Sequence, residues 1–343
     1  VAGVCRRHEP IVGAAPAAWE VVRAGQPGDA FVAVAVHPTE QAWVFAATPH
    51  ALYESTDHGQ SWRERFRLPL QAHVTGIAVG SSTKPTLLLA SDQGLYGSFD
   101  GGTQWSLVLG TLGEDENVST YVAFHPVQPE TAFLATMGGL FASSDHGRHW
   151  VPTPTPPAAK EVLHFAFDPV KQDRLYLITT QGLFVGSPST AHWEKRLAVL
   201  DAEELEVEES PVEETGEANG SLHHLSAIAI DPRAPSTLYL ATSTGVRIST
   251  DEGTTWRWLP RTGLTSPAVA RLLVRAYSPP VIYAATRDGV ARYDAAQNRW
   301  DVISTGMDAS RINDLAVTHT HLWAATAQGL YRFPVSVELM SEI

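Results

Sequence analysis

The sequence predicts an all-β fold, a seven-bladed β-propeller of four-stranded antiparallel blades. One observation is a repeat of tryptophans along nearly the whole chain, with gaps of 43, 43, 45, 43, 63 and 44 residues. A second is that each period holds short runs of β-branched and aromatic residues between Gly, Pro and Asp turns, without a segment of helical periodicity. Repeats of this length with four strands each are typical of propeller blades. The repeating residues are Trp19, Trp62, Trp105, Trp150, Trp193, Trp256 and Trp300.

The first complete period shows the four strands expected in each blade. They fall over residues 31–36, 43–48, 52–55 and 62–66. In the later periods a Gly-hydrophobic pair after the second strand indicates a tight hairpin, because glycine readily adopts the positive φ that such turns need. The second strands of those periods are expected over residues 87–90, 132–135, 175–178, 238–241, 282–285 and 322–325.

The two ends of the chain are expected to meet in the last blade. The final period supplies three strands between residues 312 and 333, whereas residues 19–23 resemble a fourth strand that lacks the three before it. We therefore expect the N-terminal strand to close the ring, and a strand over 335–340 is the alternative. The expected organisation is a tail over 1–18 and a single propeller domain over 19–343.

A shared octet, Ser-x-Asp-x-Gly-x-x-Trp, ends four of the periods. At the hairpin between the third and fourth strands, Asp can accept backbone N–H bonds, Gly can adopt a positive φ, and Trp can pack into the blade. The octet resembles the Asp-box, or bacterial neuraminidase repeat. That resemblance implies that its aspartates are structural and lie away from the ligand-binding face. They are Asp57, Asp100, Asp145 and Asp251.

Among Asp-box families, the chain is closest in type to the photosystem II assembly-factor propellers. That resemblance implies a non-catalytic binding or scaffold propeller with a protein partner, which can be a membrane-protein complex. The wider resemblance to Asp-box proteins implies a bacterial protein outside the cytoplasm, either periplasmic, secreted or membrane-attached. The chain differs in its formal charge of −13, because those propellers present an arginine-rich patch. Sialidase-like propellers are also relatives. The alternative function is therefore a glycoside hydrolase of sialidase type with a glycan ligand, although their Arg-Ile-Pro stretch is absent here.

Polar residues are expected around one mouth of the central channel. When the inner strands are aligned on their prolines, five charged or imidazole side chains fall at equivalent positions, and these are the candidate binding residues. One interpretation of this ring is that Glu161 and His224 form an acid/base pair. The other is that the channel is hydrated and carries out no chemistry. The candidates are His73, Glu161, His224, Arg271 and Arg311. One step further along, small polar residues are expected to line the channel, namely Thr75, Thr120, Ser226 and Asn313.

The longest gap in the tryptophan repeat contains an acidic insertion over 201–220. It holds nine acidic residues and no basic one, and without them the formal charge of −13 would be about −4. Because like charges repel, a solvated loop is the first interpretation, and contact with a basic partner or with Ca²⁺ are the alternatives. The nine are Asp201, Glu203, Glu204, Glu206, Glu208, Glu209, Glu213, Glu214 and Glu217.

Other classes of site are not indicated by the sequence. The acidity and the lack of a basic aromatic surface argue against nucleic acid as a partner. The histidine spacing carries no zinc signature, so we expect no metal and no cofactor. Neither a Gly-rich phosphate loop nor a nucleophile elbow occurs. Cys5 is the only cysteine, which excludes an internal disulfide and leaves lipid attachment at that residue open.

Overall fold

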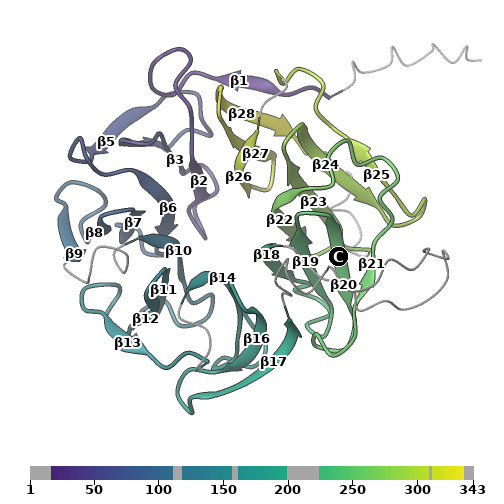
Figure 1. Cartoon of the computed structure of the whole chain (residues 1–343). Coiled ribbons are helices and arrows are strands. Elements are labelled where there is room, and N and C mark those ends of the chain that lie inside the picture. Colours follow the sequence, from purple (N-terminus) through teal and green to yellow (C-terminus); the bar gives the residue numbers. More distant parts are fainter. Residues whose placement is uncertain are drawn as a thin grey trace, which may run out of the picture.

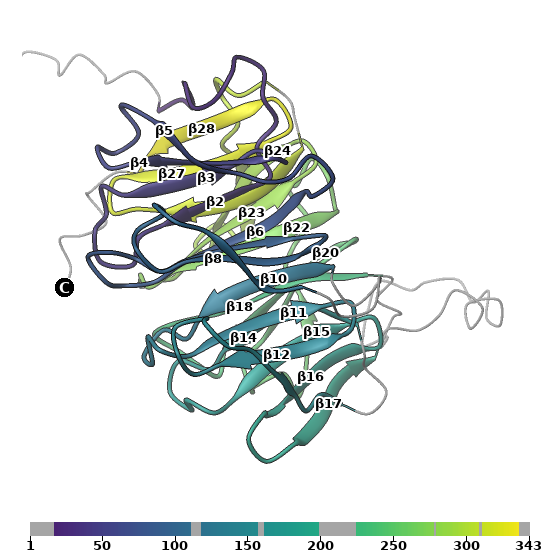
Figure 2. The ribbon, with the colours of Figure 1, turned by 90° about the vertical axis from the view of Figure 1, so that its left-hand side faces the viewer.

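The structure is a closed ring of seven four-stranded antiparallel sheets (Figure 1). It is a computed structural model that describes residues 17–110, 118–156, 161–198, 224–277, 279–308 and 311–335. Within those ranges the regular elements are all strands. The side view shows the sheets following one another around the ring (Figure 2). The predicted seven-bladed propeller is therefore confirmed.

In each blade the inner strand faces the central channel and the second strand is packed between neighbouring blades. The second strands are buried on both faces, which explains why they read as uninterrupted apolar runs such as LLLAS. The inner strands are β2 (Ala33–Val36), β6 (Val74–Val79), β10 (Ser119–Phe124), β14 (Val162–Phe167), β18 (Leu225–Ile230), β22 (Val269–Arg275) and β26 (Ile312–Val317). The second strands are β3 (Val44–Ala47), β7 (Leu87–Ser91), β11 (Ala132–Thr136), β15 (Leu175–Thr179), β19 (Leu238–Thr242), β23 (Val281–Thr286) and β27 (His321–Thr326).

The third strands are mostly buried and the outer strands form the exposed rim of the ring. Outer strands are accordingly polar in sequence, as in RERFR. The third strands are β4 (Ala51–Ser55), β8 (Gly94–Ser98), β12 (Gly139–Ser143), β16 (Gly182–Ser187), β20 (Gly245–Ser249), β24 (Gly289–Asp294) and β28 (Gly329–Pro334). The outer strands are β5 (Arg63–Arg67), β9 (Ser106–Leu109), β13 (Val151–Thr153), β17 (His192–Ala198), β21 (Arg257–Trp258), β25 (Arg299–Val302) and β1 (Glu20–Val22).

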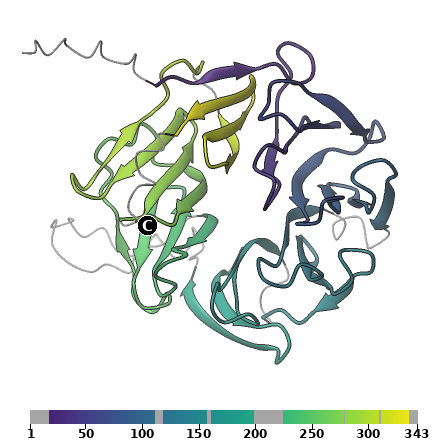
Figure 3. The same cartoon turned by 180° about the vertical axis from the view of Figure 1, so that it is seen from behind.

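Strand β1 completes the last blade and closes the ring. It pairs antiparallel with β28, with Val22 opposite Leu330, and the view from behind shows the purple β1 beside the yellow final blade (Figure 3). Trp19, just before β1, is 4% exposed and its amide donates to Thr305 O at 2.8 Å. The predicted closure is confirmed. The alternative strand over 335–340 lies almost wholly outside the described residues. The position beside β28 that this alternative strand would need is occupied by β1.

The four Ser-Asp turns share one internal hydrogen-bond pattern, which the first turn illustrates. The Ser55 hydroxyl donates to Asp57 Oδ1 at 2.7 Å and accepts from the Gly59 amide at 2.7 Å. The hydroxyl and the amide of Ser61 donate to Asp57 at 2.5 and 2.9 Å, and these bonds lower the pKa of Asp57 to about 2. The Trp62 indole donates to Gly59 O at 3.2 Å. The Ser, Gly and Trp bonds recur in the turns of Asp100, Asp145 and Asp251.

The first of these turns also joins two blades. Gly59 has a φ of 80°, and a Cβ at this position would collide with the Trp323 ring of the last blade. The Trp62 ring meets the Trp323 ring edge-on, with 6.2 Å between their centres. Glycine is required here both for its backbone conformation and for the close approach of Trp323.

The turn after the inner strand begins at His37, His125, Asp168 or Asp231 in four of the blades. Asp168 Oδ1 accepts from the amides two and three residues on, both at 2.9 Å, and His125 Nδ1 accepts from the equivalent amides at 3.2 and 3.1 Å. An amide only donates, so the hydrogen of the His125 ring is on Nε2. That Nε2 donates to Gln172 O of the next blade at 3.0 Å. Histidine at this position therefore closes its own turn and also binds the neighbouring blade.

Replacing Trp19 with Ala should destabilise the protein by about 3–5 kcal/mol, because a large buried aromatic side chain at the ring closure is lost. The measurement is the free energy of unfolding from urea denaturation. Val21→Ala, in the adjoining strand β1, is the matched control, since Val21 is 65% exposed, and it should change stability by less than about 0.5 kcal/mol. Equal losses in the two variants would contradict the role of Trp19 in closure.

The two roles of His125 can be separated by two substitutions. His125→Asp keeps an acceptor for the turn amides and loses the bond and the ring contact with Phe167 of the next blade, so it should cost about 1–2 kcal/mol. His125→Ala loses both sets of bonds and should cost about 2–3 kcal/mol. Urea denaturation again supplies the comparison. If the Asp variant were as unstable as the Ala variant, the hydrogen bonds from the turn amides to His125 would not contribute to stability.

Candidate functional site

A β-bulge recurs near the start of the inner strand in six of the seven blades. In β6, β10, β14, β18, β22 and β26 the pairing with the second strand shifts by one residue. A bulge of this kind re-aims the side chains that follow it. The residues directly after the bulge occupy one level of the ring, and they are Gly76, Tyr121, His164, Ala227, Arg271 and Asp314.

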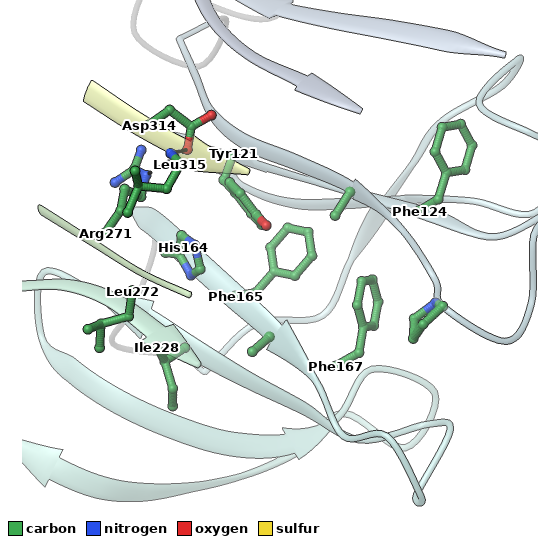
Figure 4. A pocket seen from close by; sticks show the side chains of 13 residues that line it. Tyr121, Phe124, His164, Phe165, Phe167, Ile228, Arg271, Leu272, Asp314 and Leu315 are labelled. Atoms are coloured by element: carbon green, nitrogen blue, oxygen red, sulfur yellow. Dashed lines mark hydrogen bonds and ion pairs between the residues drawn. The ribbon is translucent and has the colours of Figure 1, made fainter. Parts of the chain in front are cut away.

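A cavity of about 390 Å³ lies among five consecutive inner strands, β10 to β26 (Figure 4). Its polar side chains are four of the residues that follow the bulges: Tyr121, His164, Arg271 and Asp314. The rest of its described lining is apolar, namely Ala123, Phe124, Pro126, Phe165, Ala166, Phe167, Ile228, Leu272 and Leu315. The cavity therefore combines a polar end with an aromatic and aliphatic wall.

Arg271 and Asp314 form a loose ion pair at the polar end. Arg271 Nε lies 4.0 Å from Asp314 Oδ1, and the side chains are 31% and 28% exposed. Asp314 also accepts from the amides of Val34 and Leu315 at 3.1 and 3.0 Å. Burial raises the pKa of Asp314, and Arg271 opposes that effect. Arg271 Nη1 donates to Ala270 O at 3.1 Å, and within the described chain its guanidinium makes no further hydrogen bond.

His164 is a buried, neutral imidazole beside this pair. It is 7% exposed and its ring stacks on Tyr121 with 4.1 Å between the ring centres. Burial, assisted by the Arg271 cation, lowers the pKa of His164 to about 3. Its Nδ1 is buried without a hydrogen-bond partner among the described residues. A buried nitrogen without a partner is costly, so this imidazole leaves an unsatisfied polar atom beside the cavity.

The described lining limits the chemistry of the cavity. It supplies one carboxylate, one guanidinium and one neutral imidazole, together with the phenol of Tyr121. Asp314 is already engaged by two backbone amides and by Arg271. The arrangement suits the binding of an apolar or aromatic group that carries one polar or charged end.

The residues predicted at the channel mouth separate into two levels. His73, His224 and Arg311 precede their inner strands, and the backbone oxygen of each accepts an amide of the facing turn. Glu161 likewise precedes β14. Arg271 does not belong with them, because it lies beyond the bulge and pairs with Ala285. The alignment on prolines failed there because β22 starts ten residues before Pro279, whereas β10 starts seven before Pro126.

Two of the small polar residues expected to line the channel instead bind the next blade. Thr120 Oγ1 donates to Val162 O at 2.6 Å, and Asn313 Nδ2 donates to Phe31 O at 2.7 Å. Both sit at the bulge, where the extra residue turns its side chain toward the neighbouring inner strand. The alignment of the internal repeats on their prolines does not reveal the bulge. It therefore did not predict Tyr121, His164 and Asp314 as site residues, although each is a polar or aromatic residue on an inner strand.

Some expectations fall on residues that the structure does not describe. They include Cys5 and the acidic insertion with Glu203, Glu204, Glu206, Glu208 and Glu209. In the parts of the chain that are described, no helix is long and apolar enough to cross a bilayer. Those same parts contain no group of three or more His, Cys, Asp or Glu side chains arranged to hold a metal ion.

Solved structures match the chain over most of the ring. No family model matches it, and no curated protein matches it in sequence. YCF48 from Cyanidioschyzon merolae is similar with a TM-score of 0.65 at 13% identity, over 92% of this chain and 98% of that one. A structure of YCF48 bound to D1 peptide has a TM-score of 0.66 at 13% identity, over 95% and 97%. An ancestral GH74 enzyme has a TM-score of 0.67 at 18% identity, over 91% of this chain and 46% of the enzyme. At these identities the likeness shows the fold alone.

The depressed pKa of His164 predicts a pH-dependent stability. The pKa is about 3 in the folded protein and about 6.5 when unfolded. Between these values the unfolded state binds more protons, so stability should fall as the pH drops from about 7 towards 4. His164→Phe removes the titration and keeps a ring beside Tyr121, so its stability should fall less.

Urea midpoints at about pH 7, 6 and 5 measure this difference. His192→Phe is the control, because the His192 side chain is 75% exposed, and its pH curve should follow that of the wild type. Parallel curves for the wild type and His164→Phe would contradict the assignment of the acid-side loss to His164.

Proposed function

We propose that this chain is a non-catalytic propeller that binds a protein partner and takes one apolar or aromatic side chain of that partner into the central cavity. The observation that carries the proposal is the composition of the cavity, an aromatic wall with a single ion pair and an unpaired buried nitrogen at one end. The likeness to a propeller solved with a peptide bound supports it.

The size and polarity of the cavity fit such a ligand. A space of about 390 Å³ is at the lower end of pockets that hold small organic groups. Phe167, which meets the buried Phe165 edge-on with 5.4 Å between their ring centres, offers aromatic surface to a ring or an aliphatic chain. Arg271 at the other end can donate to a carbonyl, hydroxyl or carboxylate of the same residue.

A glycoside hydrolase is the second candidate, and the likeness to a GH74 enzyme favours it. Such enzymes use two carboxyl groups that flank the scissile bond. In the described lining of the cavity Asp314 is the single carboxylate, and its oxygens are taken by backbone amides. A sialidase-type site also needs several arginines, and that lining contributes Arg271 alone. The lack of a second carboxylate and of further arginines in the described lining favours binding over catalysis.

The finer parts of the proposal rest on the sequence. The four Ser-Asp turns support membership of the Asp-box families and, with the seven connected sheets, a single propeller domain over 19–343. By the same resemblance we place the protein outside the bacterial cytoplasm, as a subunit of a membrane-associated complex. His73, Glu161, His224 and Arg311 and the acidic residues of 201–220 are proposed as further contacts of the partner around the channel mouth.

Peptide binding tests the cavity directly. Peptides selected from a random display library on the purified protein should carry a large apolar or aromatic residue, and their affinity is measured by fluorescence anisotropy. Arg271→Gln removes the cation and Ala123→Leu fills part of the cavity, so each should weaken binding at least about tenfold. Arg292→Gln is the matched control, because that side chain lies in β24 and is 45% exposed; its affinity should stay within about twofold of the wild type.

Two results would overturn the proposal. In one, the selected peptides bind both cavity variants as tightly as they bind the wild type. In the other, the protein turns over fluorogenic sialosides or other glycosides and loses that activity in Glu161→Gln, which would establish the glycosidase instead.

A further inference from the structure

Two histidines from adjacent blades meet where the β3–β4 turn of one blade contacts the start of the inner strand of the next. His50 lies in the turn between β3 and β4, and His73 lies just before β6. Their ring centres are 4.8 Å apart and the ring planes are inclined by 48°. The backbone holds the two segments together, because the Val74 amide donates to Pro49 O at 2.8 Å. A spacing of 23 residues in the sequence gave no indication of this contact.

The hydrogen bonds of both rings leave the same nitrogen available. His50 Nδ1 lies 3.1 Å from Ala72 O, and His73 Nδ1 lies 2.8 Å from Asp92 Oδ2. A carbonyl and a carboxylate only accept, so both Nδ1 atoms carry the hydrogen and the Nε2 atom of each neutral ring keeps a lone pair. Neither Nε2 has a hydrogen-bond partner among the described residues. His125 differs, because its Nδ1 accepts from turn amides and its Nε2 bonds the next blade.

This arrangement is the one that metal-binding histidines adopt. Their Nδ1–H usually donates to a carboxylate or a backbone carbonyl, which fixes the ring and makes Nε2 more basic. Two imidazoles that share one ion at about 2.0–2.1 Å, with a tetrahedral angle between them, have ring centres about 5 Å apart. The separation of 4.8 Å between the ring centres of His50 and His73 is close to this value.

We propose that His50 and His73 form a site for a divalent transition metal ion of the class that imidazole binds well, such as Cu²⁺ or Zn²⁺. Asp92 is its positioning residue, since it also accepts from the His73 amide at 2.8 Å. The described residues supply two ligands and no larger cluster. The His73 side chain is 54% exposed, so the remaining coordination positions are open to water. None of these residues lines the central cavity, so the metal site does not depend on the peptide cavity, although His73 is also one of the partner contacts proposed around the channel mouth.

Titration with Cu²⁺, followed by calorimetry and by electron paramagnetic resonance, tests the site on the full chain. The wild type should bind one ion at this site, with the spectral signature of two imidazole nitrogens. The double variant His50→Ala/His73→Ala should lose that signature and weaken binding at least about tenfold. His192→Ala, on the exposed outer strand β17, is the control and should retain both.

Asp92→Asn separates positioning from ligation. It keeps an acceptor near His73 but removes the charge, so affinity should fall by about 10–100-fold while the two-nitrogen signature remains. Circular dichroism melting curves establish that each variant is folded. Binding that is equally tight in the double variant, or a bound-copper spectrum without imidazole nitrogens in the wild type, would overturn the proposal.

Discussion

Closure of the ring is the constraint on which the rest of the structure depends. The second strand of every blade is apolar and buried on both faces, so each blade is stable only between two neighbours. Strand β1 supplies the missing outer strand of the last blade. There Arg332 Nε donates to Glu20 Oε2 at 2.9 Å, a bond between residues that are 312 positions apart in the sequence. Closing so long a loop carries an entropic cost, which the burial of Trp19 and Val22 offsets.

The repeated backbone explains why the chemistry of the channel is uneven. Six inner strands carry the same bulge, so one residue of each reaches the same level of the ring. The identity of that residue then decides what each blade contributes. Gly76 and Ala227 contribute almost no side chain, whereas Tyr121, His164, Arg271 and Asp314 supply the polar end of the cavity. A symmetric scaffold thus presents an asymmetric site, which is what recognition of one oriented ligand requires.

Much of the fold could be predicted from the sequence, because tryptophan spacing and strand patterns report local structure directly. The closing strand at Trp19 followed from counting strands. The site was less accessible. Arg271 was assigned to the wrong level because an alignment on prolines does not account for the extra residues between β22 and Pro279. In addition, a bulge has no sequence signature of its own. The contact of His50 with His73 arises from the packing of neighbouring blades, which residue spacing does not encode.

The seam that closes the ring also borders the cavity. Asp314 belongs to the last blade and accepts from the Val34 amide of the first, and its neighbour Asn313 donates to Phe31 O across the same seam. The carboxylate that faces Arg271 is therefore also a structural link between the first and last blades. A ligand that bonds Arg271 would compete with this carboxylate only for the guanidinium, because the amides hold Asp314 in place. A ligand at the proposed site could thus be exchanged without opening the ring, so binding at the polar end of the cavity would not depend on the stability of the fold.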